Sequence, residues 1–149
     1  MTLLIGATAA AEQAVALLAE LLRSPKALFA QARDLSVGAG CRAWIRVADS
    51  PEADAWLIAW GPRSSVGKHD HGGSRGAVHV LRGALVERSW PDGDGPVAVR
   101  QLVPGSTLHV PPDRVHDVFN EGTSAALSLH VYSPRLTTMG FYPAAGATA

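Results

Sequence analysis

The stretch KHDHGGSRGAVHVLRG, residues 68–83, places two of the chain's six histidines one residue apart, beside two glycines and just before an apolar run. Residues i and i+2 of a β-strand face the same side, so His69 and His71 are expected to point to one place. Imidazole is the commonest protein ligand for first-row transition metals, which makes the pair a candidate metal site. Because H-x-H pairs also occur by chance on solvent-facing strands, the interpretation depends on the surrounding sequence.

Short β-prone runs surround this stretch and alternate with Gly, Pro and Asp from residue 38 onward. The segment PDGDGP, residues 91–96, is a strong turn signal. Many short strands at this spacing predict an all-β sandwich or small β-barrel. The expected strands fall within residues 41–48, 55–60, 76–90, 97–103, 106–110, 116–120 and 126–133.

Residues 1–37 differ in sequence pattern from the rest of the chain, and this pattern predicts a short helical segment. Apolar residues recur at helical spacing over residues 9–22, and a second helix is expected where Ser24 occupies a cap position and Pro25 the first turn. No linker follows these helices. We therefore expect one domain over the whole chain, with the helices packed outside a barrel formed by residues 38–142.

Composition excludes several classes of protein. The 149 residues contain 13 basic and 13 acidic side chains, so the chain has no electrostatic footprint for nucleic acid or anionic membrane. No apolar run approaches the roughly 20 residues that span a bilayer, and Glu12 and Glu20 argue against an export signal. The single cysteine, Cys41, excludes an internal disulfide and is consistent with a reducing compartment. We expect a cytoplasmic protein, monomeric or homodimeric.

Two blocks of the chain, residues 61–83 and 105–120, carry Gly, His, Pro and Asn residues at regular spacing. Together they resemble the two signature motifs of the cupin superfamily, a small β-barrel or jelly roll that holds a metal in its mouth. In that superfamily the first motif contributes H-x-H and an acidic ligand, but here Gly76 stands at the acidic position. The second motif contributes one more histidine. The ligands implied by the resemblance are His69, His71 and His116.

The missing carboxylate is informative about the substrate. Three neutral ligands leave a divalent ion with its full charge, and such an ion favours anions such as a thiolate as further ligands. Non-haem Fe(II) oxygenases usually use two histidines and a carboxylate. A three-histidine cupin therefore belongs to a smaller group.

A further segment, SLHVYSPRL at residues 128–136, places Ser128, His130 and Tyr132 at period two, so that they share one strand face. It resembles the Ser-His-Tyr relay of the cysteine dioxygenase family, the thiol dioxygenases. Residues 57–74, including Trp60 nine residues before the first ligand histidine, and the tail SPRLTTMGFY are similar to that family too. The resemblance covers residues 42–142.

This resemblance implies an Fe(II) enzyme that oxidises a thiol with O2 to the sulfinic acid, with the substrate sulfur bound as thiolate. Tyr132 would donate a hydrogen bond to the reacting groups, His130 would pair with Tyr132, and Ser128 would fix the imidazole tautomer. A hydrolase built on Ser128 and His130 is disfavoured, because the segment has no nucleophile-elbow glycines and no acid partner.

Two departures from the family concern the substrate pocket. Gly76 also aligns with the cysteine that some members crosslink to the tyrosine, which excludes a thioether here. The family's Tyr-x-Arg, whose arginine clamps a substrate carboxylate, aligns without gaps with Cys41 and Ala43. In that register Cys41 and Ala43 face inward, whereas a slip of one residue turns Arg42 inward. Both registers remain open at this stage.

The two registers predict different substrates. The ungapped register enlarges the pocket and favours a thiol bulkier than cysteine, such as ergothioneine, whose quaternary ammonium suits an aromatic cage. The alternative is a cysteine or 3-mercaptopropionate dioxygenase with an arginine as carboxylate partner. The cage candidates are Trp44, Trp56 and Trp90, and the arginines are Arg42, Arg46 and Arg75. The candidate substrate-binding residues are Arg42, Ala43, Trp44, Arg75 and, at the barrel mouth, His109.

Two other classes of function compete with a thiol dioxygenase. One is a cupin enzyme of another reaction type, against which the S-x-H-x-Y segment argues. The other is a non-catalytic cupin that binds a metal or a ligand as a sensor or store. Of these we favour the thiol dioxygenase, and we expect no nucleic-acid or membrane partner.

Overall fold

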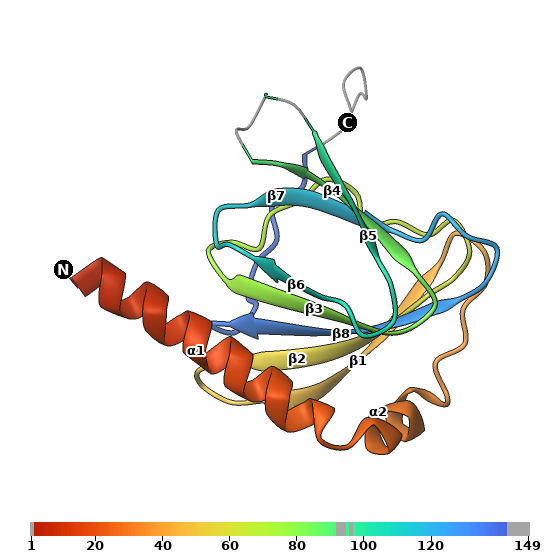
Figure 1. Ribbon diagram of the computed structural model, residues 1–149, viewed down its shortest axis with the longest axis horizontal. Coiled ribbons are helices and arrows are strands. Elements are labelled where there is room, and N and C mark those ends of the chain that lie inside the picture. The colour runs from red at the N-terminus through yellow and green to blue at the C-terminus, as the bar shows by residue number, and fades with distance from the viewer. Residues whose placement is uncertain (1, 92–94, 96, 143–149) are drawn as a thin grey trace.

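In the part of the chain that the structure describes, eight short strands follow residue 41, close to where the sequence predicts them. The computed structural model describes residues 2–91, 95 and 97–142 (Figure 1). The turn predicted at residues 91–96 lies mostly outside the described residues. The strands are β1 (Arg42–Asp49), β2 (Asp54–Trp60), β3 (Arg75–Arg82), β4 (Leu85–Trp90), β5 (Ala98–Leu102), β6 (Thr107–Val110), β7 (Val115–Phe119) and β8 (Ala126–Ser133).

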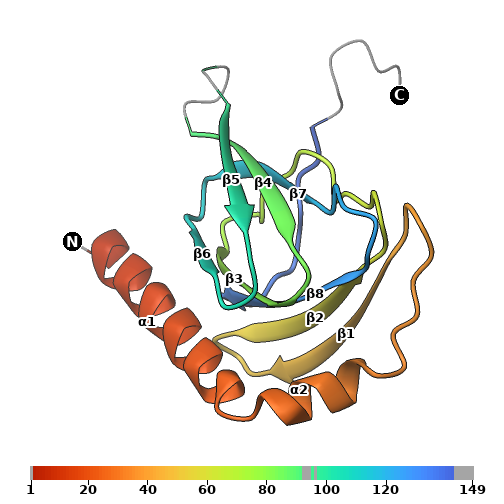
Figure 2. The ribbon, with the colours of Figure 1, turned by 45° about the vertical axis from the view of Figure 1, so that its right-hand side comes forward.

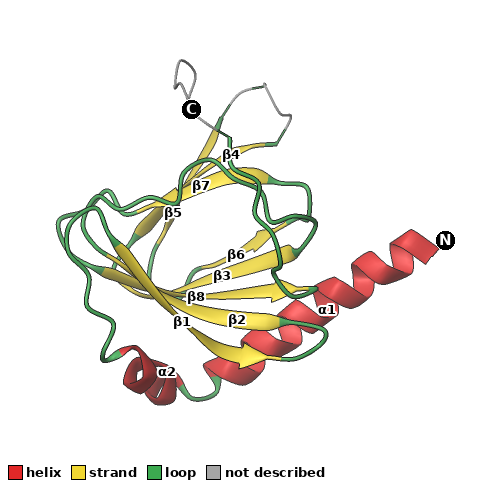
Figure 3. Ribbon diagram, turned by 180° about the vertical axis from the view of Figure 1, so that it is seen from behind, coloured by secondary structure: helices red, strands yellow, loops and turns green. Residues whose placement is uncertain are grey.

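The strands form two antiparallel sheets that face each other as the walls of a barrel (Figure 3). One sheet has five strands in the order β1-β2-β8-β3-β6, and the other has three in the order β5-β4-β7. The prediction of an all-β small barrel with a helical N-terminal segment is confirmed.

Two helices cover the outer face of the five-stranded sheet (Figure 2). Helix α1 (Thr2–Leu22) begins earlier than the predicted residue 9, and α2 (Pro25–Ala32) begins at the predicted proline, with Ser24 at the N-cap. Leu18 and Leu28 pack there against alternate residues of the central strands. None of the described helices combines the length and apolarity needed to cross a bilayer.

Strand β8 shows how the five-stranded sheet separates the helices from the barrel interior. All eight of its residues are buried, because β2 and β3 flank it and both of its faces are covered. Leu127, Leu129 and Val131 join the cluster packed against the helices. The alternate residues, including Ser128, His130 and Tyr132, therefore point into the barrel, on one face as predicted.

The register of β1 settles which of its residues face inward. Arg42 pairs with Trp60, which lies in the interior apolar cluster, whereas Ala43 pairs with Ala59, which packs on the helix side. The ungapped register, in which Cys41 and Ala43 face inward, is therefore wrong, and the register slipped by one residue is the one observed.

Candidate metal centre

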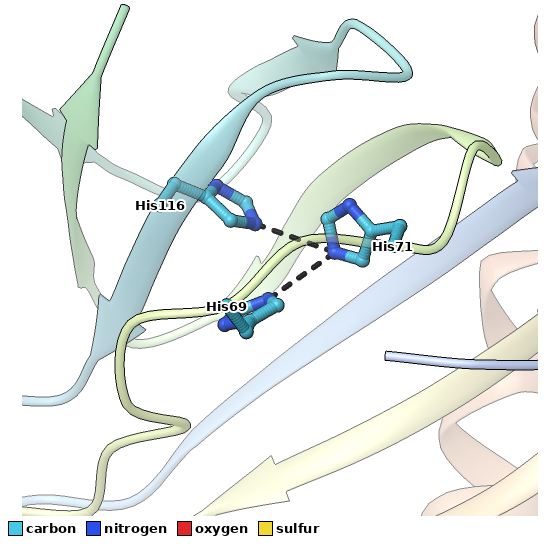
Figure 4. A group of neighbouring side chains, drawn as sticks. All are labelled: His69, His71 and His116. Carbon is cyan, nitrogen blue, oxygen red and sulfur yellow. Dashed lines mark hydrogen bonds between the residues drawn. The ribbon is translucent and has the colours of Figure 1, made fainter. Parts of the chain in front are cut away.

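Three buried histidines from two separate segments converge at one end of the barrel (Figure 4). His69 and His71 lie in the connection between β2 and β3 rather than in a regular strand, and His116 lies in β7. Two backbone hydrogen bonds join His69 and His116, with N···O distances of 2.8 and 2.9 Å. The Nε2 atom of His71 lies 3.2 Å from that of His69 and 3.4 Å from that of His116. The predicted convergence of the three imidazoles is therefore present.

Two of these rings are oriented by hydrogen bonds at their other nitrogen. The Nδ1–H of His69 donates to the carbonyl of Gly67 at 2.7 Å, and the Nδ1–H of His116 donates to the Glu87 carboxylate at 2.7 Å. In both rings the Nε2 lone pair is then free for a ligand bond. The Nδ1 of His71 is buried and has no hydrogen-bond partner among the described residues.

Glu87 is a site residue that the sequence analysis missed. It lies on β4, beside β7, and is almost fully buried. The available signal was an acidic residue in the middle of the apolar run ALVERSW, residues 84–90, since a buried carboxylate needs a partner. Its hydrogen bond to His116 places a carboxylate next to a candidate site whose three possible direct ligands are all imidazoles.

The two aspartates next to His69 and His116 in the sequence hold the neighbouring loops in place. Asp117 accepts hydrogen bonds from Ser65 Oγ and the amide of Gly67. Asp70 accepts from the amides of Gly72 and Gly140 and from the hydroxyl of Tyr142. Asp70 thereby ties the C-terminal segment 134–142 to the loop that carries His69 and His71.

Burial keeps the imidazoles of His69 and His71 neutral at physiological pH. It lowers the pKa of His69 to about 4 and that of His71 to about 3, with a smaller contribution from the neighbouring His116 in each case. A neutral imidazole is the form that binds a metal.

The arrangement fits a first-row transition metal ion. The candidate ligand atoms all lie within 4.8 Å of one another. Nitrogens bound to one ion at about 2.1 Å lie roughly 3.0–3.4 Å apart, which matches the two short separations around His71. Lone pairs of His69 and His116 that face a shared point repel one another unless a cation lies between them. Imidazole ligands suit iron, zinc, copper and nickel.

A second polar chain runs through the barrel beside the histidine cluster. The indole Nε1–H of Trp60 donates to Ser128 Oγ at 2.8 Å, and Ser128 Oγ lies 2.6 Å from His130 Nε2. The Nδ1 of His130 lies 3.4 Å from the Tyr132 hydroxyl, and the Tyr132 ring packs beside the ring of His71. The sequence analysis placed Ser128, His130 and Tyr132 on one strand face, but it noted Trp60 only for its spacing from His69. Burial lowers the pKa of His130 to about 3 and raises the pKa of Tyr132.

A cavity of about 310 Å³ connects the two clusters. The three ligand histidines, His130 and Tyr132 line it, together with apolar and aromatic side chains and one arginine, Arg42. The wall also includes four apolar residues to which the sequence analysis assigned no role. These are Ile58, Leu136, Met139 and Phe141.

Five of the residues considered for substrate binding, among them Arg46, are absent from the cavity lining. Ala43 faces the helix side of β1, and His109 is exposed on β6, where Leu108 and Val110 take the inward positions. Arg75 pairs with Ser133 at the start of β3 and is absent from the cavity lining. Of the three cage candidates, Trp44 and Trp56 line the cavity, whereas Trp90 packs under the ammonium group of Lys68.

Comparison with known proteins agrees with this geometry. The family model described as cysteine dioxygenase type I matches residues 4–144. The chain belongs to the cysteine dioxygenase type I family. No curated protein matched the sequence.

Solved structures show that this cysteine dioxygenase family member has the cupin, or double-stranded β-helix, fold. The protein TT1209 from Thermus thermophilus is 30% identical, with 69% of this chain and 93% of that chain covered and a TM-score of 0.59. A protein with a double-stranded β-helix domain from Klebsiella pneumoniae is 15% identical, with 75% and 93% covered and a TM-score of 0.62. A cupin superfamily protein from Desulfitobacterium hafniense is 18% identical, with 66% and 83% covered and a TM-score of 0.55.

The position of Gly76 bears on the crosslink found in some members of the family. A Cβ atom added at Gly76 would lie 3.4 Å from Cε1 of the Tyr132 ring. A side chain there would therefore touch the tyrosine, but glycine offers no sulfur, so Tyr132 is held without a covalent crosslink, by packing and by the contact of its hydroxyl with His130.

Proposed function

We propose that the protein is an Fe(II)-dependent thiol dioxygenase that converts a small thiol and O2 to the sulfinic acid. The observation that carries this proposal is that His69, His71 and His116 converge on a cavity that Tyr132 and Arg42 also line. Membership of the cysteine dioxygenase type I family supports the same reaction. In this reaction both atoms of O2 end on sulfur, the thiol proton is kept, and sulfur loses the four electrons that O2 gains.

The three histidines would hold the iron through their Nε2 atoms. Bound there, Fe(II) would supply the electron-transfer chemistry with O2 that side chains lack, and a positive charge that attracts the thiolate. Glu87 would keep the imidazole of His116 in the correct tautomer and orientation.

The series of side-chain contacts that runs from Trp60 through Ser128 and His130 to Tyr132 would orient one proton at the cavity wall. Because an indole only donates, Ser128 accepts from Trp60, and its own proton is then directed to Nε2 of His130. The proton of His130 then lies on Nδ1, which faces the Tyr132 oxygen. The Tyr132 hydroxyl is left to donate its proton into the cavity. Burial raises the pKa of Tyr132, so the phenol stays protonated at neutral pH.

Arg42 would bind a carboxylate of the substrate, which supports a carboxylated thiol. Cysteine and 3-mercaptopropionate meet this requirement, and so does ergothioneine, whose ring and quaternary ammonium would lie against Trp44 and Trp56. The cavity volume of about 310 Å³ favours ergothioneine, the largest of these three thiols. A cytoplasmic location and a monomeric or homodimeric state stay predictions from the sequence.

The proposed reaction is tested by loading the protein with Fe(II) without oxygen and then measuring O2 consumption with cysteine, 3-mercaptopropionate, cysteamine and ergothioneine. We expect O2 uptake with at least one thiol and a product heavier by two oxygen atoms. His116→Gln is expected to abolish both iron binding and O2 uptake, whereas His79→Gln, outside the cavity, is the matched control. Iron-loaded protein that consumes no O2 with any thiol would instead favour a non-catalytic metal-binding cupin.

A further inference from the structure

Segment 134–142 forms one wall of the cavity, and its first end is held by residues 52–54. The amide of Leu136 donates to Asp54 Oδ1 at 3.2 Å. The hydroxyl of Ser133, just before the segment, donates to the carbonyl of Glu52 at 2.8 Å. Asp54 and Ser133 are almost fully buried. Because breaking a buried hydrogen bond leaves its groups without a partner in water, this end is expected to stay in place.

The second end of the segment is held by the loop that carries two of the three histidines. The amide of Asp70 donates to the carbonyl of Gly140 at 2.9 Å, and its carboxylate accepts from the Tyr142 hydroxyl at 2.7 Å. Phe141 pairs with His69 as in a short antiparallel ladder. Phe141 and Tyr142 are nevertheless 61% and 42% exposed. Hydrogen bonds close to water open at low cost in free energy, so this end is expected to open first.

The second end also borders the mouth of the cavity. Trp44 and Phe141 both line the cavity, yet Trp44 is 56% exposed and Phe141 is exposed as well. The mouth therefore lies between β1 and the end of the segment that Asp70 holds. Release of that end widens the entrance, while the buried end serves as the hinge.

Asp70 connects the segment to the candidate metal centre. It lies between His69 and His71 in the sequence, so a movement that pulls on Asp70 acts on both histidines. The ring of Phe141 also packs near that of His69, with 6.1 Å between the ring centroids. A metal ion that fixes the two imidazoles would therefore fix the surface on which the segment docks. Coupling of this kind is reciprocal, so docking of the segment would also favour metal binding.

We propose that segment 134–142 is a hinged lid that opens at its Asp70 end to admit the substrate, and that metal binding and lid closure stabilise each other through Asp70. Asp70 is then a positioning residue that acts through His69 and His71. This inference rests on the proposed function, since it concerns access to the same cavity. It adds that the lid is closed for a larger share of the time once the metal is bound.

The coupling is tested by hydrogen exchange on the full chain with and without Zn²⁺, an ion without redox chemistry that imidazoles also bind. We expect Zn²⁺ to slow exchange at the amides of Gly140 and Tyr142 about tenfold, within the range typical of coupled sites. The amide of Gly105 is the control, because it donates to the Val80 carbonyl in the turn between β5 and β6. Equal slowing at all three amides would indicate general stabilisation alone. That result, or no slowing at Gly140 and Tyr142, would overturn the inference.

Two glycine-to-alanine variants test the contact from the side of the lid. A Cβ atom at Gly140 would lie 2.7 Å from Asp70 Oδ2, whereas a Cβ atom at Gly38 meets none of the described residues within 4 Å. We expect Gly140→Ala to speed exchange at the Tyr142 amide and to weaken Zn²⁺ binding by up to about tenfold, the same factor in reverse. Gly38→Ala should change neither quantity.

Tyr142→Phe provides a milder variant, because it removes only the hydroxyl that donates to Asp70. It should shift exchange and Zn²⁺ affinity in the same direction as Gly140→Ala, by a smaller factor. Exchange at the Tyr142 amide that is unchanged in Gly140→Ala would overturn the inference. So would a folded Gly140→Ala variant that exchanges quickly there but binds Zn²⁺ as tightly as the unaltered protein.

Thiol oxidation distinguishes failure of this inference from failure of the proposed reaction. At saturating Fe(II), we expect Gly140→Ala to raise KM for the thiol severalfold with little change in kcat, because the lid holds the substrate but does not touch the reacting atoms. An unchanged KM would show that the lid does not control entry. If exchange and Zn²⁺ affinity respond as expected but no thiol is oxidised, the reaction is wrong and the lid stands. If a thiol is oxidised but Zn²⁺ leaves exchange unchanged, the lid is wrong and the reaction stands.

Discussion

Changing Glu87 to glutamine tests whether this buried carboxylate belongs to the metal centre. Glu87 Oε2 lies 2.7 Å from Nδ1 of His116, and both side chains are at most 5% exposed. Glutamine keeps the shape and one hydrogen-bond acceptor but removes the negative charge. Loss of such a partner typically weakens metal binding 10- to 100-fold, or by about 1.4–2.7 kcal/mol. We expect Glu87→Gln to weaken metal binding by an amount near the lower end of this range. Glu87→Ala leaves the Nδ1–H of His116 without an acceptor, so we expect it to weaken metal binding by an amount near the upper end.

The assay is an anaerobic competition between the protein and a chelator for Fe(II). Glu121→Gln is the control, because Glu121 is an exposed glutamate just beyond the same strand as His116. Circular dichroism confirms that each variant is folded. A Glu87→Gln protein that binds Fe(II) as tightly as the unaltered protein would refute the reasoning, since the carboxylate would then not act through His116.

Three further predictions follow from the polar contacts around the cavity. Burial lowers the pKa of His130 to about 3 from 6.5, so the unfolded chain takes up the proton first as the pH falls. His130 alone should therefore lower the free energy of unfolding by about 2 kcal/mol between pH 7 and pH 5, and urea titrations of a His130→Asn variant should show a profile that is flatter by about this amount. Trp60→Phe removes the donor to Ser128 and is expected to lower kcat about tenfold with little change in KM. Trp90→Phe serves as control. An unchanged kcat in the Trp60→Phe variant would exclude a role for the indole of Trp60. Asp70→Asn should speed hydrogen exchange at the amide of Gly140, and unchanged exchange would show that Asp70 does not hold the C-terminal segment.

The fold and the cluster of three histidines could be predicted from the sequence, because both depend on local pattern. Runs of β-prone residues between Gly, Pro and Asp predicted seven extended segments that correspond to the eight described strands, the run at residues 76–90 being divided between β3 and β4. The period-two spacing of Ser128, His130 and Tyr132 was sufficient to place them on one face, because β8 is a regular central strand. The three ligand histidines lie at spacings that resemble a known family, and the structure brings them together.

The register of β1 could not be predicted from the sequence, because the alternation of apolar and polar residues that normally marks the inward face of a strand is weak there. Its two faces carry mixed apolar and charged residues, since this edge strand has the cavity rim on one side and the helices on the other. A bulge between Arg46 and Ala48 also shifts its pairing with β2, so an alignment without gaps counted the positions wrongly. Only the pairing of Arg42 with Trp60 resolves the direction of the arginine.

Glu87 and Trp60 illustrate a second limit. Each acts through a partner on a different strand, 29 and 68 residues away in sequence. The sequence marks Glu87 as an unusual acid in an apolar run, but the identity of the partner depends on which strands become neighbours. Contacts of this kind follow from topology rather than from spacing.

The C-terminal segment 134–142 has a consequence for how this family member could acquire new substrates. Leu136, Met139 and Phe141 form part of the cavity wall, yet they lie outside both sheets and contribute nothing to the barrel core. Replacing Leu136 or Met139 alters the shape of the cavity without changing a candidate metal ligand or a strand residue, whereas Phe141 also packs against the ring of His69. Substrate range and barrel stability can therefore diverge during evolution, and a library confined to this short stretch is a rational starting point for redirecting specificity.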